Sequence, residues 1–244
     1  MSSLSQLALD IIKSYLTLPF PGHHVQCPYF NNRRVRLRGG LRALIGKGSP
    51  EDIVEEAMII SLREKIDLKN LSDVDLKKFL VDHKLGIDCS GLIYHILDAE
   101  MEATQDKSLH QVLRRPWFKN PLRKLLVKLR PIENTGVGTF HHEVNSFEIP
   151  LKDIQPGDLI IMMGAGPKQD YNHILLINQI ANSIIQYTHS FQYPSGGLYN
   201  HGVRQEKIEI TDLNKNLLEQ NWSEPQMKDY AKGAKELKIK RLKN

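Results

Sequence analysis

A cysteine stands at the start of a predicted helix. Cys89 follows Gly86 and Asp88, two residue types common at helix boundaries, and apolar residues recur at helical spacing over 92–97. A helix N-terminus supplies partial positive charge and free N–H groups, which stabilise a thiolate and can also hold an oxyanion. We therefore interpret Cys89 as a candidate nucleophile. The alternative is a buried structural cysteine.

Two histidines could supply the base and its orienting partner. His173 opens the apolar run 174–177, which is typical of a strand, and the chain returns through a turn near 181–182. If that turn is the centre of a hairpin, His189 lies opposite His173 on the same face. A histidine in that place could hold the other imidazole in one tautomer. The alternative is a pair of surface histidines, because a register slip of one residue puts them on opposite faces.

Helices are expected first and strands later along the chain. Helical patterns cover about 3–18, 49–65, 72–83, the segment that begins near Cys89, and 104–130 with breaks at Pro116 and Pro121. Strand patterns cover 158–163, 173–180, 183–190 and 203–210, with turn residues between them. This order predicts the α+β class rather than a parallel βαβ sheet.

Three short motifs connect the cysteine, a strand and the histidine. They are Asp88-Cys89-Ser90-Gly91-Leu92, the sequence LKDIQPGDLI at 151–160, and Asn172-His173-Ile174-Leu175-Leu176. In kind and in order they resemble the motifs of the NlpC/P60 cysteine peptidases. The resemblance covers about 86–98 and 150–190. It implies a papain-like α+β core in which the nucleophile, at a helix N-terminus, packs on an antiparallel β-sheet, with helical insertions.

The resemblance also implies roles for six residues. They are Cys89 as nucleophile, His173 as general base, His189 as the residue that orients it, and Asp88, Ser90 and Tyr29 as substrate-binding residues. In the family, the residues at the places of Asp88 and Ser90 help to bind the free amino end of the substrate. Tyr29 enters through Cys27-Pro28-Tyr29, which is similar to a Pro-Tyr element upstream of the nucleophile. Tyr29 could equally be a loop aromatic packed on the core, and Asp88 could be only a helix cap.

The family's reaction is hydrolysis of an amide in bacterial cell-wall stem peptides, commonly between D-glutamate and a diamino acid. The resemblance implies that the Cys89 thiolate attacks the carbonyl and that the His173 imidazolium protonates the leaving amine. Water then hydrolyses the thioester. The expected substrate is therefore a peptide or a murein fragment, and no cofactor is expected.

Two other function classes stay open. One is an amidase or acyltransferase relative that uses the same thiol and histidine on a different substrate. The other is a protein that binds an anionic polymer while the site is idle. A metal site is not expected, because the pairs His23-His24 and His141-His142 have no Cys or carboxylate at the usual ligand spacing.

The positive charge is concentrated in two segments. The net charge of the 244 residues is +5, yet the stretch from Lys107 to Arg130 alone contains eight Lys or Arg and no acid. The second basic stretch runs from Lys228 to Lys243. Either could meet an anionic partner or be a solvated face. We expect one domain over 1–244, with insertions at about 31–85 and 100–148 and a basic C-terminal helix at about 224–244.

Composition narrows the cellular setting. The chain is 41% hydrophobic and 25% charged, as in globular proteins, and no apolar stretch approaches the roughly 20 residues that span a bilayer. The N-terminal segment lacks the basic start of a signal peptide, and Asp10 and Lys13 interrupt its apolar residues. Two cysteines give little indication of a disulfide framework. These features favour a cytoplasmic location without a transmembrane segment, unless the protein is delivered by another route.

Overall fold

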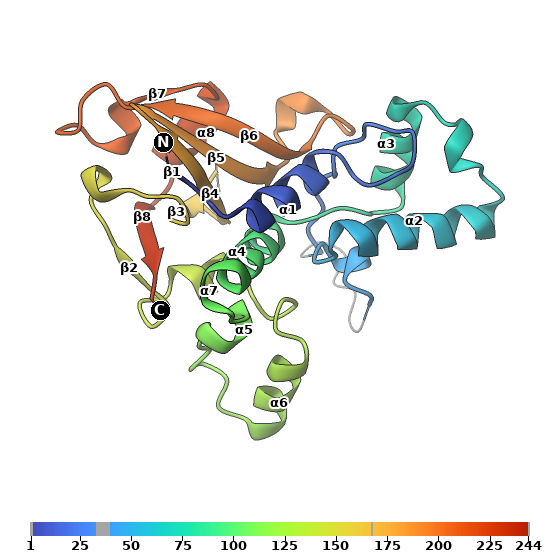
Figure 1. Ribbon diagram of the computed structural model, residues 1–244, viewed down its shortest axis with the longest axis horizontal. Helices are drawn as coiled ribbons and strands as arrows, with labels where there is room; N and C mark the ends of the chain where they lie inside the picture. The colour runs from blue at the N-terminus through green and yellow to red at the C-terminus, as the bar shows by residue number, and fades with distance from the viewer. Residues whose placement is uncertain (1, 33–39, 167, 244) are drawn as a thin grey trace.

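The computed structural model describes residues 2–32, 40–166 and 168–243 and has the predicted α+β class (Figure 1). The helices are α1 (Gln6–Leu16), α2 (Pro50–Glu64), α3 (Asp73–Asp82), α4 (Cys89–Gln105), α5 (Leu109–Val112), α6 (Pro121–Leu129), α7 (Val137–His141) and α8 (Pro225–Lys232). The strands are β1 (Ser2–Ser3), β2 (Ser146–Glu148), β3 (Leu159–Ala165), β4 (Tyr171–Ala181), β5 (Ile184–Phe191), β6 (Gly202–Glu209), β7 (Asn221–Trp222) and β8 (Glu236–Leu242). Part of the predicted insertion at 31–85, namely 33–39, lies outside the described residues.

The long helices begin where local capping chemistry predicts. Ser49 and Asp52 form a reciprocal capping box at the start of α2, in which each side chain accepts from the other residue's backbone N–H. The Ser72 side chain accepts from the N–H of Asp75 at the start of α3. Of the helical pattern predicted over 104–130, with breaks at Pro116 and Pro121, only the end of α4 and the short helices α5 and α6 form. Pro116 lies in the non-helical stretch, and Pro121 is the first residue of α6, where a missing N–H costs no helical hydrogen bond.

One antiparallel sheet runs in the order β2-β8-β3-β4-β5-β6-β7, and β1 pairs with β4. The predicted basic helix over about 224–244 is therefore wrong in its second half. The chain forms α8 and then β8, which pairs with both β2 and β3. The hydrophobic pattern of this segment has the two-residue period of a strand, because Leu237 and Ile239 alternate with Lys238 and Lys240.

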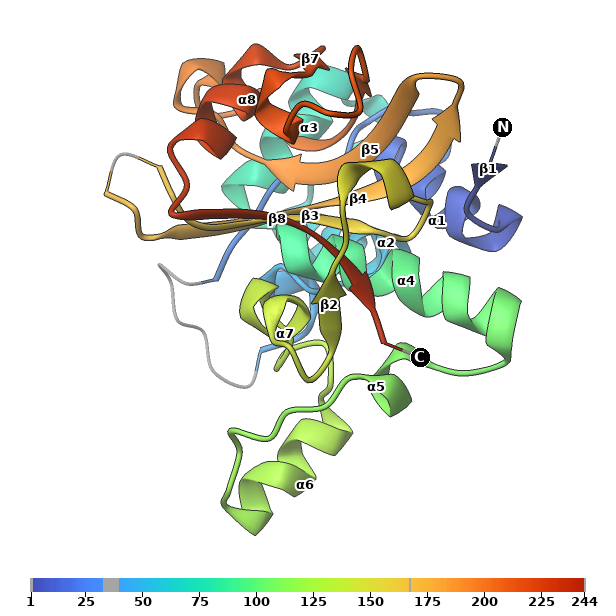
Figure 2. The same cartoon turned by 90° about the vertical axis from the view of Figure 1, so that its left-hand side faces the viewer.

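The sheet is covered on both faces. Ile174 and Leu176 of β4 belong to the core cluster that contains the apolar residues of α1 and α4. Leu175 and Ile177, which point the other way, pack in a second cluster with residues of β7 and α8. Figure 2 shows α8 and β7 on one side of the sheet and α4 and α7 on the other. The beginning of α4 is thus held against β4.

The helix α6 lies away from the rest of the fold. Both views show it at the far end of the α5–α6 segment, on the side of α7 that faces away from the sheet (Figures 1 and 2). Of its residues, only Val127 is buried. In the part of the chain that is described, the helices are too short or too polar to cross a bilayer.

Candidate active site

Cys89 is the first residue of α4, as predicted. Asp88 is the N-cap, and its carboxylate accepts from the backbone N–H of Gly91 at 2.6 Å. The sulfur of Cys89 is nearly inaccessible and faces the backbone N–H groups of Ser90 and Ile174. Burial raises the pKa of the thiol to about 12, and the charge of Asp88 adds to that rise. Desolvation therefore favours the neutral thiol and opposes the stabilisation that a helix N-terminus gives to a thiolate.

His173 and His189 meet inside the protein. Nε2 of His173 lies 3.1 Å from Nδ1 of His189, and both side chains are buried. Burial, and then the neighbouring His189, lower the pKa of His173 well below its ordinary value. His173 is thus a neutral imidazole, and the alternative of two exposed surface histidines is wrong.

The register that brings the two histidines together differs from the prediction. The hairpin turns at 182–183 between Ala181 and Ile184, and the register shifts by one residue between Ile177 and Gln179. Continued beyond the last pair, Leu176 with Thr188, this register places His189 diagonally across from His173 rather than opposite it. Without the shift the two histidines would lie on opposite faces of the sheet.

A carboxylate lies beyond His189, and sequence reasoning missed it. Oε2 of Glu224 is 3.1 Å from Nε2 of His189 and accepts a hydrogen bond from the Tyr187 hydroxyl at 3.2 Å. Burial opposes ionisation of Glu224, but its contacts with His189, Tyr193 and Tyr187 bring its pKa below the usual range. Glu224 comes just before α8, at a helix start, and nothing in the local sequence connects it with the site.

This arrangement defines the proton positions. A negatively charged Glu224 favours the proton of His189 on Nε2, so Nδ1 of His189 accepts from Nε2–H of His173. The unprotonated nitrogen of His173 is then Nδ1. The chain of groups can therefore deliver a neutral base whose cationic form is stabilised by a buried carboxylate.

Cys89 and His173 converge at the start of β4. The Cys89 sulfur faces the N–H of Ile174, the residue after His173. The described pairs between β4 and β5 end at Leu176 and Thr188, so His173 lies beyond the paired part of these two strands. The His173 side chain points to the α8 side of the sheet, together with Leu175, whereas α4 packs on the other side. The structure thus places the Cys89 sulfur against the backbone next to His173, whereas the imidazole lies toward the opposite side of β4.

Asp88 and Ser90 are engaged by a buried lysine. The Lys47 ammonium donates to Oδ1 of Asp88 at 2.8 Å, to Oγ of Ser90 at 2.7 Å and to the carbonyl of Thr135 at 3.0 Å. The side chains of Lys47, Asp88 and Ser90 are all buried. The sequence had no signal for Lys47, which looks like an ordinary loop lysine. An ammonium group thus already occupies the place that the resemblance gives to the amino end of a substrate.

Tyr29 lies near Cys89 and is held by the hydrogen bonds of its backbone. Burial raises the pKa of its hydroxyl. The N–H of Tyr29 donates to Nδ1 of His201 at 3.1 Å, and Tyr29 forms a bridge with Ile87, two residues before Cys89. The structure therefore brings this loop aromatic to the site despite the long separation in sequence.

Because His201 must stay neutral to accept from Tyr29, acid should destabilise the fold. Burial lowers the pKa of His201 to about 4, whereas a free imidazole has about 6.5. The unfolded chain then binds the extra proton, so the free energy of unfolding falls as the pH drops from 6.5 toward 4, by at most about 1.4 kcal/mol per pH unit from this residue. Urea unfolding across that range measures the slope. His201→Asn keeps the acceptor and should make the slope smaller, although buried His173 still contributes to it. An unchanged slope would contradict the assignment.

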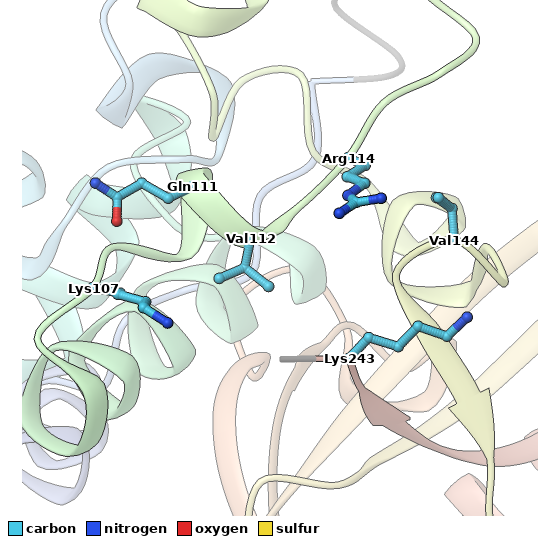
Figure 3. A pocket seen from close by; sticks show the side chains of 6 residues that line it. All are labelled: Lys107, Gln111, Val112, Arg114, Val144 and Lys243. Atoms are coloured by element: carbon cyan, nitrogen blue, oxygen red, sulfur yellow. The ribbon is translucent and has the colours of Figure 1, made fainter.

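The ends of the two basic segments meet in a hollow away from the cysteine. Lys107 and Arg114 come from the first segment and Lys243 from the second, and they line a depression of about 480 Å³ with Gln111, Val112 and Val144 (Figure 3). Neighbouring cations of this kind attract anions. The predicted anionic partner stays a prediction.

Comparisons with known proteins do not extend the motif resemblance. No family of known proteins matches the chain, and neither a curated protein nor a solved structure is detectably similar to it. The likeness to a peptidase family therefore depends on the three motifs and on the geometry of the site.

Proposed function

We propose that the protein is a cysteine hydrolase with a papain-like core of the NlpC/P60 type, which cleaves an amide bond in peptidoglycan stem peptides. The observation that carries the proposal is the buried line of His173, His189 and Glu224, together with the Cys89 sulfur, which faces the backbone N–H of the residue after His173. A thiol that can reach a neutral base with an oriented tautomer is the arrangement that acyl transfer requires.

The reaction begins with a neutral thiol and a neutral imidazole. His173 removes the thiol proton as the Cys89 sulfur attacks the carbonyl carbon, and the first N–H groups of α4 stabilise the oxyanion. The imidazolium protonates the amine, which leaves, and the acyl group stays on sulfur as a thioester. His173 then removes a proton from water, which attacks the thioester and regenerates the thiol. Glu224, through His189, stabilises the imidazolium in both steps.

The pH dependence of the rate follows from these pKa values. Because the pKa of His173 is lowered, we expect kcat/KM to fall only at a pH below the usual imidazole value of about 6.5. Because the pKa of Cys89 is about 12, we expect no alkaline change near the ordinary thiol value of about 8.5. Initial rates from pH 4 to 10 measure both limbs. A profile with a limb near 8.5 would contradict a neutral resting pair.

Synthetic stem peptides that contain the D-glutamyl to diamino acid bond test the function directly. Mass spectrometry should find a new glutamate carboxylate and the free amine of the diamino acid. Hydroxylamine should divert the acyl group to a hydroxamate, since it attacks a thioester. Absence of turnover and of hydroxamate on every stem peptide would overturn the proposal.

One observation favours a second candidate, an amidase or acyltransferase relative. Lys47 holds Asp88 and Ser90, so these two side chains are not free to bind the amino end of a peptide. An acyl substrate without a free amino terminus would suit such a site. Product analysis with and without an added amine distinguishes the two, because an acyltransferase gives the new amide in place of the acid.

A further inference from the structure

The outer face of α6 is a stripe of exposed leucines. Leu122, Leu125, Leu126 and Leu129 are spaced as one face of a helix and are between 50% and 72% exposed. Val127, on the opposite side of the helix, is the buried residue that attaches α6 to the protein. An amphipathic helix normally turns its apolar stripe to the core, but α6 turns it outward.

Cations without acidic partners occur in the same segment, and two of them, Lys124 and Lys128, line a depression with Val127 on the side of α6 that faces the protein. Lys119, Lys124 and Lys128 are exposed and form no ion pair within the described residues. The nearest acid along the chain after α6, Glu133, is paired with Arg42 and Arg130. Trp117, just before α6, is 40% exposed. The same short helix therefore carries an exposed apolar face and several cations on its other sides, with no acidic residue in the stretch from Lys107 to Arg130.

We propose that α6 and the turn before it bind the surface of a membrane that contains anionic lipids. The helix would lie in the plane of the membrane, with its leucines at the boundary of headgroups and acyl chains and its lysines on the phosphates. Trp117 precedes the helix and is 40% exposed, and an indole prefers the interface. This binding is independent of Cys89 and goes beyond the proposed hydrolysis.

The charge of this segment argues against a second copy of the chain or a soluble polyanion as the partner of this face. A second copy of the chain, packed stripe to stripe, would place lysines against lysines, because the stretch from Lys107 to Arg130 contains no acid. A soluble polyanion would pair with the lysines but would leave four leucines in water. An anionic lipid surface buries the leucines and neutralises the lysines in one contact.

Sedimentation with lipid vesicles tests the proposal on the whole chain. We expect binding to vesicles of phosphatidylcholine with phosphatidylglycerol, weakened by salt, and little binding to phosphatidylcholine alone. The double variant Leu125→Ser with Leu129→Ser should lower the vesicle affinity at least about tenfold. The matched control is Ile59→Ser with Leu62→Ser on α2, where two apolar side chains are 58% and 80% exposed but Glu55 and Glu56 are neighbours. This control should bind like the wild type.

Tryptophan fluorescence gives an independent measurement. The chain has two tryptophans, and Trp222 is only 7% exposed, so a blue shift on adding anionic vesicles reports on Trp117. Trp117→Phe should abolish the shift and leave the thermal unfolding midpoint nearly unchanged.

Three results would overturn the proposal. One is equal loss of vesicle binding in the α2 and α6 variants, and another is equal binding to neutral and anionic vesicles. The third is a concentration-dependent dimer in analytical ultracentrifugation that the α6 variant abolishes, without vesicle binding by the wild type. That result would assign the leucines to a second copy of the chain.

Discussion

Cys89→Ala is expected to lower the hydrolysis rate by about 10⁴-fold or more, and His173→Ala by a similar factor. Without the sulfur no thioester forms, and without the imidazole the thiol, whose pKa is about 12, keeps its proton at neutral pH. Because the two groups act as a unit, the double variant should be no slower than the worse single variant. Steady-state rates and hydroxamate formation with stem peptides measure the effect.

Cys27→Ala is the matched control for the loss of a thiol. Cys27 is also buried and unpaired, and burial likewise raises its pKa to about 12, but its carbonyl and N–H groups bind Val203 and Tyr15 rather than β4. The hydrolysis rate of the Cys27→Ala variant should stay near that of the wild type. Undiminished turnover by Cys89→Ala would remove the assignment of the nucleophile.

The positioning groups behind His173 should have smaller effects. Glu224→Gln keeps the size of the side chain but removes the charge that stabilises the imidazolium, so the rate should fall by about 10- to 1000-fold while the thioester still forms. A change confined to stability, with the pH profile of kcat/KM unaltered, would mean that Glu224 only holds the fold together.

Lys47→Met is expected to destabilise the fold by about 3–5 kcal/mol. The substitution removes a buried ammonium but leaves the Asp88 carboxylate inside the protein without its counter-charge. In the native protein the Lys47 ammonium also donates to Ser90 and to the carbonyl of Thr135, so the buried ion pair is well hydrogen-bonded. Most of the lost stability therefore comes from leaving the Asp88 carboxylate unpaired, and not from losing the contact itself. Urea unfolding followed by circular dichroism measures the change.

Two control variants distinguish the cost of leaving Asp88 unpaired from the cost of replacing any lysine. Asp88→Asn added to Lys47→Met removes the unpaired charge while asparagine still caps α4, and we expect it to recover most of the lost stability. Lys78→Met breaks an exposed pair with Asp75 at 3.0 Å and should change the unfolding midpoint little. A midpoint for Lys47→Met equal to that of Lys78→Met would show that the buried pair contributes nothing.

Local chemistry made the frame of the fold predictable. Helix starts at Ser49, Ser72 and Asp88 follow from side chains that satisfy N–H groups two or three residues away. The strands β3 to β6 follow from apolar runs between turn residues. The C-terminal strand was mispredicted because its lysines were interpreted as a helical charge pattern, although the alternation of Leu237 and Ile239 with lysines has the period of a strand.

In the candidate site too, some features could be predicted from the sequence and others could not. The sequence alone was enough to put Cys89 at a helix N-terminus and to bring His173 and His189 into one hairpin, because neighbours along the chain set both features. The register shift after Ile177 was not predictable, since the pairing of β4 with β5 depends on what packs on each face of the sheet.

Only the tertiary structure decided what surrounds these three residues. It brings Glu224 to His189, Lys47 to Asp88 and His201 to Tyr29, and each of these contacts joins segments far apart in the sequence. A buried charge or imidazole needs a partner wherever the fold happens to bring one, and no local pattern specifies which residue that is. The proposed nucleophile and base could therefore be recognised from the sequence, whereas the groups that hold their charges and protons depend on the fold.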